Sequence, residues 1–86
     1  MSTVVLDFYS ETCNPCKALA RDLEEISKGC VFKLEKLNIF DNYELTEKYN
    51  IRSVPTLVVL KGEEIKAIYS KYNGMAELKK FIEDNV

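Results

Sequence analysis

The chain has 86 residues, which is room for one small globular domain, and we expect residues 1–86 to form a single domain. Its 14 acidic and 12 basic residues give a net charge of −2, without the basic excess of a nucleic-acid-binding domain. It has no histidine, so zinc proteases and hydrolases that use a histidine base are excluded.

The hydrophobic pattern predicts strands and helices in the order β-α-β-α-β-β-α. A buried strand (4–9) precedes a polar break and an amphipathic helix that starts at Pro15 and closes at Lys28-Gly29. A second strand (31–39), a short helix (43–49), a hairpin of two strands (56–60 and 64–69) and a last helix (76–85) follow. The opening strand–helix–strand implies a right-handed parallel unit, and the hairpin adds an antiparallel half. We therefore expect an α/β fold, with a mixed four-stranded sheet and helices on both faces.

The first residues do not resemble a targeting signal. No basic region precedes the short apolar run, and Asp7 interrupts that run, so we expect no signal peptide. No stretch approaches the ~18 apolar residues that a membrane span needs. We expect a cytoplasmic monomer without membrane or nucleic-acid partners. In the reducing cytoplasm, a cysteine pair is more often catalytic or metal-binding than structural.

The motif Cys13-Asn14-Pro15-Cys16 lies between the first strand and the first helix. A helix N-terminus has unsatisfied N–H groups and about half a positive charge, both of which stabilise a thiolate. We expect this to lower the pKa of Cys13 from ~8.5 into a range of roughly 3.5–7.5. Cys16 follows one turn later on the same side, within bonding reach. Cys13 is therefore the expected exposed nucleophile, and Cys16 the shielded resolving thiol.

The cysteines allow two other interpretations. Half of a zinc site would need two more ligands, and only Cys30 and carboxylates could supply them. A purely structural disulfide does not suit a cytosolic chain. We expect a redox-active Cys13–Cys16 disulfide, no metal and no other cofactor. Cys30 has no obvious partner and is expected to be a small half-buried residue, with a regulatory or dimer-forming thiol as the alternative.

Three segments together are similar to the thioredoxin family. The run VLDFYSETCNPCK (5–17) resembles its active-site segment, IRSVPTL (51–57) its cis-proline loop, and KLNI (36–39) its central strand. The resemblance covers about residues 4–86. The family's first strand and first helix have no counterpart, as in short glutaredoxin-like thioredoxins. The resemblance implies the thioredoxin fold and a thiol:disulfide oxidoreductase that reduces substrate proteins. Its own reductant would be a thioredoxin reductase-like enzyme or glutathione.

The resemblance also assigns a substrate-binding surface. It implies a cis peptide bond before Pro55, and backbone hydrogen bonds from Val54 to an extended substrate. Thr12, Asn14 and Pro15 flank the cysteines and would contact the same substrate. Thr12 stands where the family usually has tryptophan, and Asn14 where it usually has glycine. A loop glycine of the family has Lys71 as its nearest match. These departures leave the redox potential and the partner surface open.

Asp7 lies in an otherwise apolar strand, where a carboxylate is costly unless it is paired or protonated. Without histidine, an Asp7 with a raised pKa is the candidate general base for Cys16. Its position resembles the family's buried aspartate beneath the second cysteine, and Lys36 resembles the partner lysine. The alternative is an Asp7 at an edge, in contact with solvent.

Two other functions remain open on the sequence alone. One is a glutaredoxin-type oxidoreductase that depends on glutathione. The other is a non-catalytic binding module that has the same fold.

Overall fold

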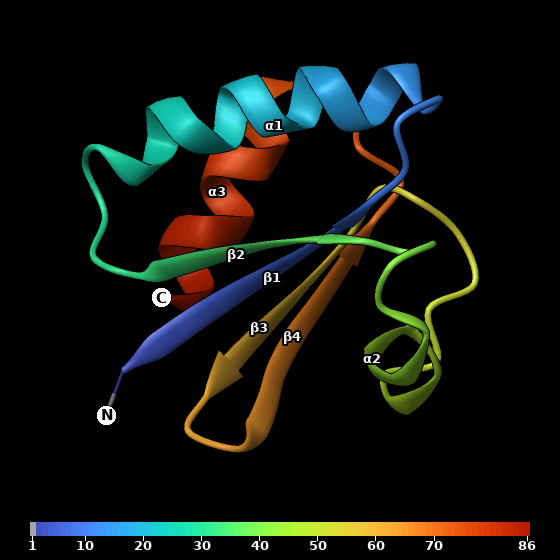
Figure 1. Ribbon diagram of the computed structural model, residues 1–86. Coiled ribbons are helices and arrows are strands. Elements are labelled where there is room, and N and C mark those ends of the chain that lie inside the picture. The colour runs from blue at the N-terminus through green and yellow to red at the C-terminus, as the bar shows by residue number, and fades with distance from the viewer. Residues whose placement is uncertain (1) are drawn as a thin grey trace.

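The computed structural model describes residues 2–86 (Figure 1). Its elements follow the predicted order: β1 (Thr3–Tyr9), α1 (Asn14–Ser27), β2 (Lys33–Asn38), α2 (Tyr43–Lys48), β3 (Thr56–Lys61), β4 (Glu64–Ser70) and α3 (Met75–Asn85). The strands form one sheet in the order β2-β1-β3-β4. β1 and β2 are parallel, whereas β3 is antiparallel to both β1 and β4. The expected mixed four-stranded sheet is therefore confirmed.

Helices cover both faces of this sheet, as expected (Figure 1). Successive strand residues point to opposite faces, so the sheet has an apolar cluster on each face. On one face, α1 and α3 pack on the sheet through Val5, Leu19, Leu23, Ile26, Leu57, Val59, Tyr69, Leu78 and Ile82. On the other face, Leu6, Phe8 and Val58 are covered by side chains that include Leu45 and Tyr49 at α2.

The second strand starts later than the sequence predicts. Val31 is β-branched and was expected inside it, but β2 begins at Lys33 and Val31 is 96% exposed. The parallel register pairs Lys33 with Val4, so Val31 would lie opposite residue 2, ahead of the first residue of β1. Without a neighbouring strand to pair with, the local preference of Val31 for extended backbone does not lengthen the sheet.

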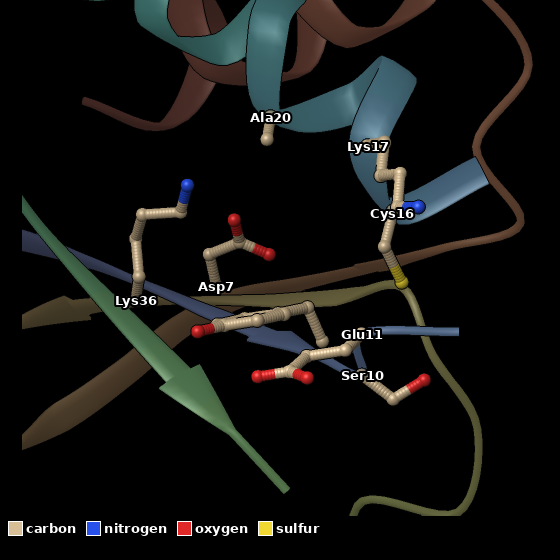
Figure 2. A pocket seen from close by; sticks show the side chains of 8 residues that line it. Asp7, Ser10, Glu11, Cys16, Lys17, Ala20 and Lys36 are labelled. Atoms are coloured by element: carbon tan, nitrogen blue, oxygen red, sulfur yellow. The ribbon is translucent and has the colours of Figure 1, made fainter. Parts of the chain in front are cut away.

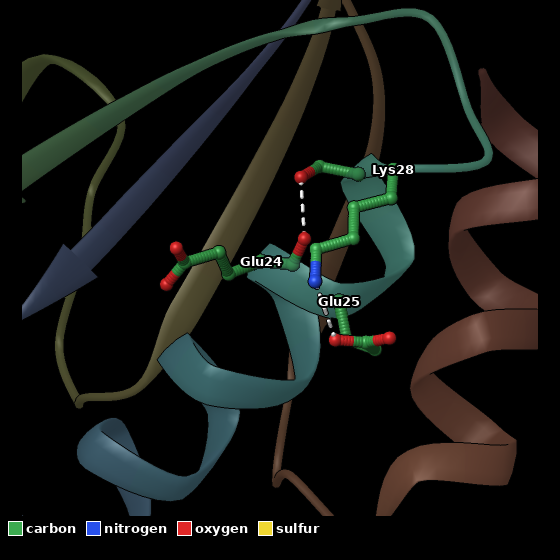
Figure 3. Close-up of polar contacts among 4 residues, drawn as sticks. Glu24, Glu25 and Lys28 are labelled. Carbon is green, nitrogen blue, oxygen red and sulfur yellow. Dashed lines mark hydrogen bonds and ion pairs between the residues drawn. The ribbon is translucent and has the colours of Figure 1, made fainter.

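The C-terminal end of α1 is closed by local polar contacts (Figure 3). The Ser27 hydroxyl donates a hydrogen bond of 2.6 Å to the Glu24 carbonyl oxygen, and Lys28 forms an exposed ion pair of 3.1 Å with Glu25. The Gly29 N–H donates to the Ile26 carbonyl oxygen at 3.0 Å. An exposed ion pair such as Lys28–Glu25 contributes at most about 1 kcal/mol to stability. Burial of the apolar face therefore stabilises α1 far more than this ion pair does.

Several loops meet at one edge of the sheet. The parallel strands β1 and β2 both end there, at the paired residues Tyr9 and Asn38. β3 begins at the same edge, because Phe8 pairs with Thr56, and β4 ends there, because Thr56 pairs with Ser70. In α/β sheets, sites form at the carboxyl ends of parallel strands.

Within residues 2–86, no helix is both long enough and apolar enough to cross a membrane.

Candidate active site

Cys13 and Cys16 form a disulfide at the start of α1. Cys13 is the N-cap, with extended backbone (φ −91°, ψ 105°), and Pro15 lies in the first helical turn. The Cys16 backbone N–H donates to the Cys13 Sγ at 3.2 Å, and the two Cα atoms are 5.2 Å apart. A helix N–H directed at this sulfur stabilises negative charge on it.

The two sulfur-bearing residues differ in exposure. Cys13 is half-buried, whereas Cys16 is 3% exposed. The neighbouring Thr12, Asn14 and Pro15 are all exposed and surround Cys13. A large substrate can therefore approach Cys13 but not Cys16.

The cis-proline loop lies at the same edge of the sheet. The Val54–Pro55 peptide bond is cis, which confirms that expectation. Pro55 is buried and Val54 half-buried, and the Thr56 hydroxyl donates to the Ser53 carbonyl oxygen at 2.7 Å, which closes the turn. The Phe8–Thr56 pairing puts this turn beside the loop that carries Cys13.

Lys71 follows the strand residue that pairs with Thr56, so its backbone lies next to this turn. Its φ is 60°, in the left-handed region that favours glycine. This conformation agrees with the sequence interpretation, which matched Lys71 to a glycine of the thioredoxin family. The lysine side chain is exposed there.

Asp7 is a buried and unpaired carboxyl group. It is 0% exposed, and neither carboxylate oxygen has a hydrogen-bond partner in the described part of the chain. Burial raises its pKa from 3.8 to about 6, and the positive charge of Lys36 offsets part of this increase. The expectation of a buried carboxyl group with a raised pKa is confirmed, and the solvated alternative is wrong.

Lys36 lies directly across from Asp7 in the β1–β2 register. Its residue is exposed, and its Nζ lies 5.8 Å from the centroid of the Tyr9 ring. Over residues 2–86, no ion pair within 4.0 Å joins Lys36 to Asp7. Lys36 therefore acts on Asp7 through its charge rather than through a hydrogen bond.

One cavity of about 210 Å³ brings Asp7, Cys16 and Lys36 together (Figure 2). In Figure 2, the Asp7 carboxylate lies between the Lys36 and Cys16 side chains. The sequence interpretation did not assign five other residues to this site. Strand alternation from Asp7 and helical spacing from Cys16 could have identified two of them, Tyr9 and Ala20. The five residues are Tyr9, Ser10, Glu11, Lys17 and Ala20.

Cys30 is remote from the dithiol. It lies beyond the C-terminal end of α1, whereas Cys13 and Cys16 lie at its N-terminal end. A helix of 14 residues is about 20 Å long, which separates the two ends. Cys30 is a half-buried free thiol that packs against the α1–α3 side of the core, as the simpler expectation held.

Comparisons with known proteins point to one family. Residues 1–84 match the family model described as Thioredoxin. A thioredoxin of Buchnera aphidicola subsp. Acyrthosiphon pisum is 41% identical over 87 residues, covering 99% of this chain and 81% of the relative. A thioredoxin of Pseudomonas aeruginosa is 33% identical over 85 residues, covering 96% of this chain and 79% of the relative.

Solved structures have the same fold. A mutant thioredoxin from Halobacterium salinarum superposes with a TM-score of 0.88 at 28% identity, covering 98% of this chain and 74% of that chain. A structure titled "Structure of a malarial protein" superposes with a TM-score of 0.86 at 22% identity, and the match covers 100% of this chain and 99% of that chain. The second similarity concerns the fold alone.

Proposed function

Because the chain belongs to the thioredoxin family and is a dithiol–disulfide oxidoreductase, we propose that it reduces disulfides of substrate proteins, with Cys13 as nucleophile and Cys16 as resolving thiol. The observation that carries these roles is the difference in exposure at the start of α1. Cys13 is accessible and caps the helix, whereas Cys16 is 3% exposed. The fold family implies disulfide-bearing substrate proteins and a reductase as partners.

In the first step, the Cys13 thiolate attacks one sulfur of the substrate disulfide. The S–S bond of the substrate breaks, one substrate sulfur leaves as a thiolate, and Cys13 is joined to the other in a mixed disulfide. The helix N-terminus favours this step because it stabilises the thiolate of Cys13 before attack. Extended substrate backbone pairs with Val54 beside Pro55, and Thr12, Asn14 and Pro15 contact the substrate around the sulfur.

In the second step, the Cys16 thiol loses its proton and attacks the Cys13 sulfur. The mixed disulfide breaks, the second substrate sulfur leaves as a thiolate, and the Cys13–Cys16 disulfide forms. Two carboxyl groups line the cavity beside Cys16, Asp7 and Glu11. We assign Asp7 as the base, because it is buried without a hydrogen-bond partner, whereas Glu11 is exposed to solvent. A cavity of about 210 Å³ can hold water, which occupies ~30 Å³, so water can relay the proton. Lys36 keeps Asp7 available as a carboxylate near neutral pH.

Two electrons have moved to the substrate at this point, so a partner must return two electrons to the Cys13–Cys16 disulfide. We propose a thioredoxin reductase-like partner in the cytoplasm, with residues 1–86 acting as one monomeric domain. Glutathione is the competing reductant.

Insulin reduction tests both the activity and the reductant. We expect turnover with dithiothreitol, and faster turnover with NADPH and a thioredoxin reductase than with glutathione and its reductase. A faster reaction with glutathione would assign the protein to the glutaredoxin type. No turnover with dithiothreitol would contradict the reductive function and favour a binding module.

A further inference from the structure

Two loops run side by side next to the dithiol. The last paired residues of β1 and β2 are Tyr9 and Asn38, and the Ile39 N–H donates to the Tyr9 carbonyl oxygen at 2.9 Å. This hydrogen bond continues the strand pairing by one step. The loop of residues 10–13, which carries the nucleophile, therefore lies against the loop of residues 39–42.

A hollow of about 320 Å³ opens between these loops. Thr12, which directly precedes Cys13, is part of its wall, so the hollow adjoins the loop that carries the nucleophile. Phe40 also lines it and is 60% exposed, although exposure of a large aromatic side chain has a cost in water. The full lining consists of Glu11, Thr12, Asn38, Phe40 and Asp41.

The loop that presents Phe40 is held by Asn38. The Asn38 Oδ1 accepts a hydrogen bond from the Phe40 N–H at 2.9 Å. The Asn38 carbonyl oxygen accepts from the Asp41 N–H at 3.0 Å and from the Asn42 side-chain amide at 2.9 Å. The backbone that carries the aromatic ring is therefore ordered before any partner binds, which reduces the entropy lost on binding.

The charges of the hollow have one sign. Its charged lining residues are the carboxylates Glu11 and Asp41, and neither forms an ion pair among the described residues. No lysine or arginine belongs to the lining. An aromatic face attracts a cation, and free carboxylates accept charge-assisted hydrogen bonds from a guanidinium or ammonium group. The hollow thus suits a long basic side chain.

We propose that this hollow is a specificity subsite for an arginine or lysine of the substrate protein, at a position that flanks the disulfide attacked by Cys13. The proposal rests on the proposed function, because it places the subsite on the reduced substrate. The basic side chain lies over Phe40, and its charged group reaches Glu11 and Asp41. Rim charges of this kind act mainly on association, so the preference should weaken as salt is added.

The test uses synthetic disulfide-bonded peptides that differ only at the residues flanking one cysteine, which are arginine, alanine or glutamate. We expect kcat/KM for the arginine peptide to exceed that for the glutamate peptide about fivefold at low salt, which corresponds to ~1 kcal/mol. Phe40→Ala and Asp41→Asn should each reduce the ratio of kcat/KM for the arginine peptide to kcat/KM for the glutamate peptide. Neither substitution should change kcat/KM for the alanine peptide. Tyr43→Ala is the matched control, because Tyr43 is an exposed aromatic residue of the same region that does not line the hollow.

A second readout does not depend on turnover. Amide NMR signals of residues 38–42 should shift saturably with an arginine peptide whose cysteines are replaced by serine, in the parent protein but not in Asp41→Asn. Equal kcat/KM for the three peptides, or a preference that survives Phe40→Ala and Asp41→Asn, would overturn the subsite. Absence of turnover with every peptide, together with the NMR shifts, would overturn the reductive function and leave the subsite standing.

Discussion

Asp7 of β1 and Cys16 of α1 line the same cavity, and no hydrogen bond joins them in the part of the chain that the structure describes. A direct hydrogen bond would stabilise one protonation state of the carboxyl group. Instead burial dominates and raises the pKa of Asp7 to about 6. The carboxylate therefore predominates at neutral pH in a place where its charge is costly, which is a favourable state for accepting a proton.

Asp7→Asn should stabilise the fold in a pH-dependent way. The pKa of Asp7 is raised from 3.8 to about 6 on folding, so stability from the neutral carboxyl group is present below pH 4 and lost as the pH rises through 6. The shift corresponds to about 3 kcal/mol. Asparagine stays neutral at every pH. At pH 8 the free energy of unfolding of the variant should therefore exceed that of the parent by up to this amount, and the difference should vanish towards pH 4.

Urea denaturation of the oxidised proteins between pH 4 and pH 8 measures this effect. The exposed Asp84→Asn in α3 is the matched control and should follow the parent at every pH. If the difference in free energy of unfolding between the parent and Asp7→Asn stays constant across this pH range, Asp7 is not a buried, titrating carboxyl group.

The same substitution should slow only the second chemical step. Asparagine cannot accept the Cys16 proton, so release of the mixed disulfide should slow by about 10²-fold or more, the lower end of general-base effects. Formation of the mixed disulfide should change little, because Asp7 lies beside Cys16. Stopped-flow single-turnover kinetics separates the two steps. In the parent, release should accelerate as the pH rises through about 6, and a variant with parental release rates would show that water or a substrate group takes the proton.

Cys13 should titrate well below a free thiol. The helix N–H groups at the start of α1 stabilise its thiolate, so we expect an apparent pKa below about 7.5. The rate of iodoacetamide alkylation against pH, followed in reduced Cys30→Ser protein, measures this value without interference from the third thiol. A value of about 8.5 or higher would contradict the role of Cys13 as nucleophile.

The loop that precedes α3 is linked to α1 by a hydrogen bond from the Tyr72 hydroxyl to the Asp22 carboxylate. This bond also raises the pKa of Tyr72. Tyr72→Phe removes the donor and should lower the free energy of unfolding by about 1 kcal/mol. Tyr43→Phe, which removes an exposed hydroxyl group, is the control for chemical denaturation. Equal stability of parent and Tyr72→Phe would show that the contact contributes nothing.

The sequence predicts those features that depend on local pattern. The order of the elements follows from hydrophobic periodicity, and the buried state of Asp7 follows from the apolar residues around it in the strand. The start of β2 could not be predicted in this way. Val31 has the side chain of a strand residue, but the register between β1 and β2 decides where pairing begins. This register depends on residues that are far apart in the sequence, so no local pattern predicts it.

The candidate site shows the same division. Cys13 and Cys16 are three residues apart, so helix geometry alone relates them. The hollow at Phe40 depends on two loops that are far apart in the sequence and that meet only because β1 and β2 are parallel neighbours. Phe40 is likewise exposed because of the turn that Asn38 stabilises. The periodic pattern of apolar residues does not predict this exposure.

The assignment of Cys13 as nucleophile and Cys16 as resolving thiol is tested most directly by trapping the intermediate. Reduced Cys16→Ser protein is mixed with a disulfide-bonded substrate, and the adduct is located by mass spectrometry of proteolytic fragments. We expect a stable mixed disulfide on Cys13, and no adduct or turnover with Cys13→Ser. An adduct on Cys30, or trapping by Cys13→Ser through Cys16, would contradict the assigned roles.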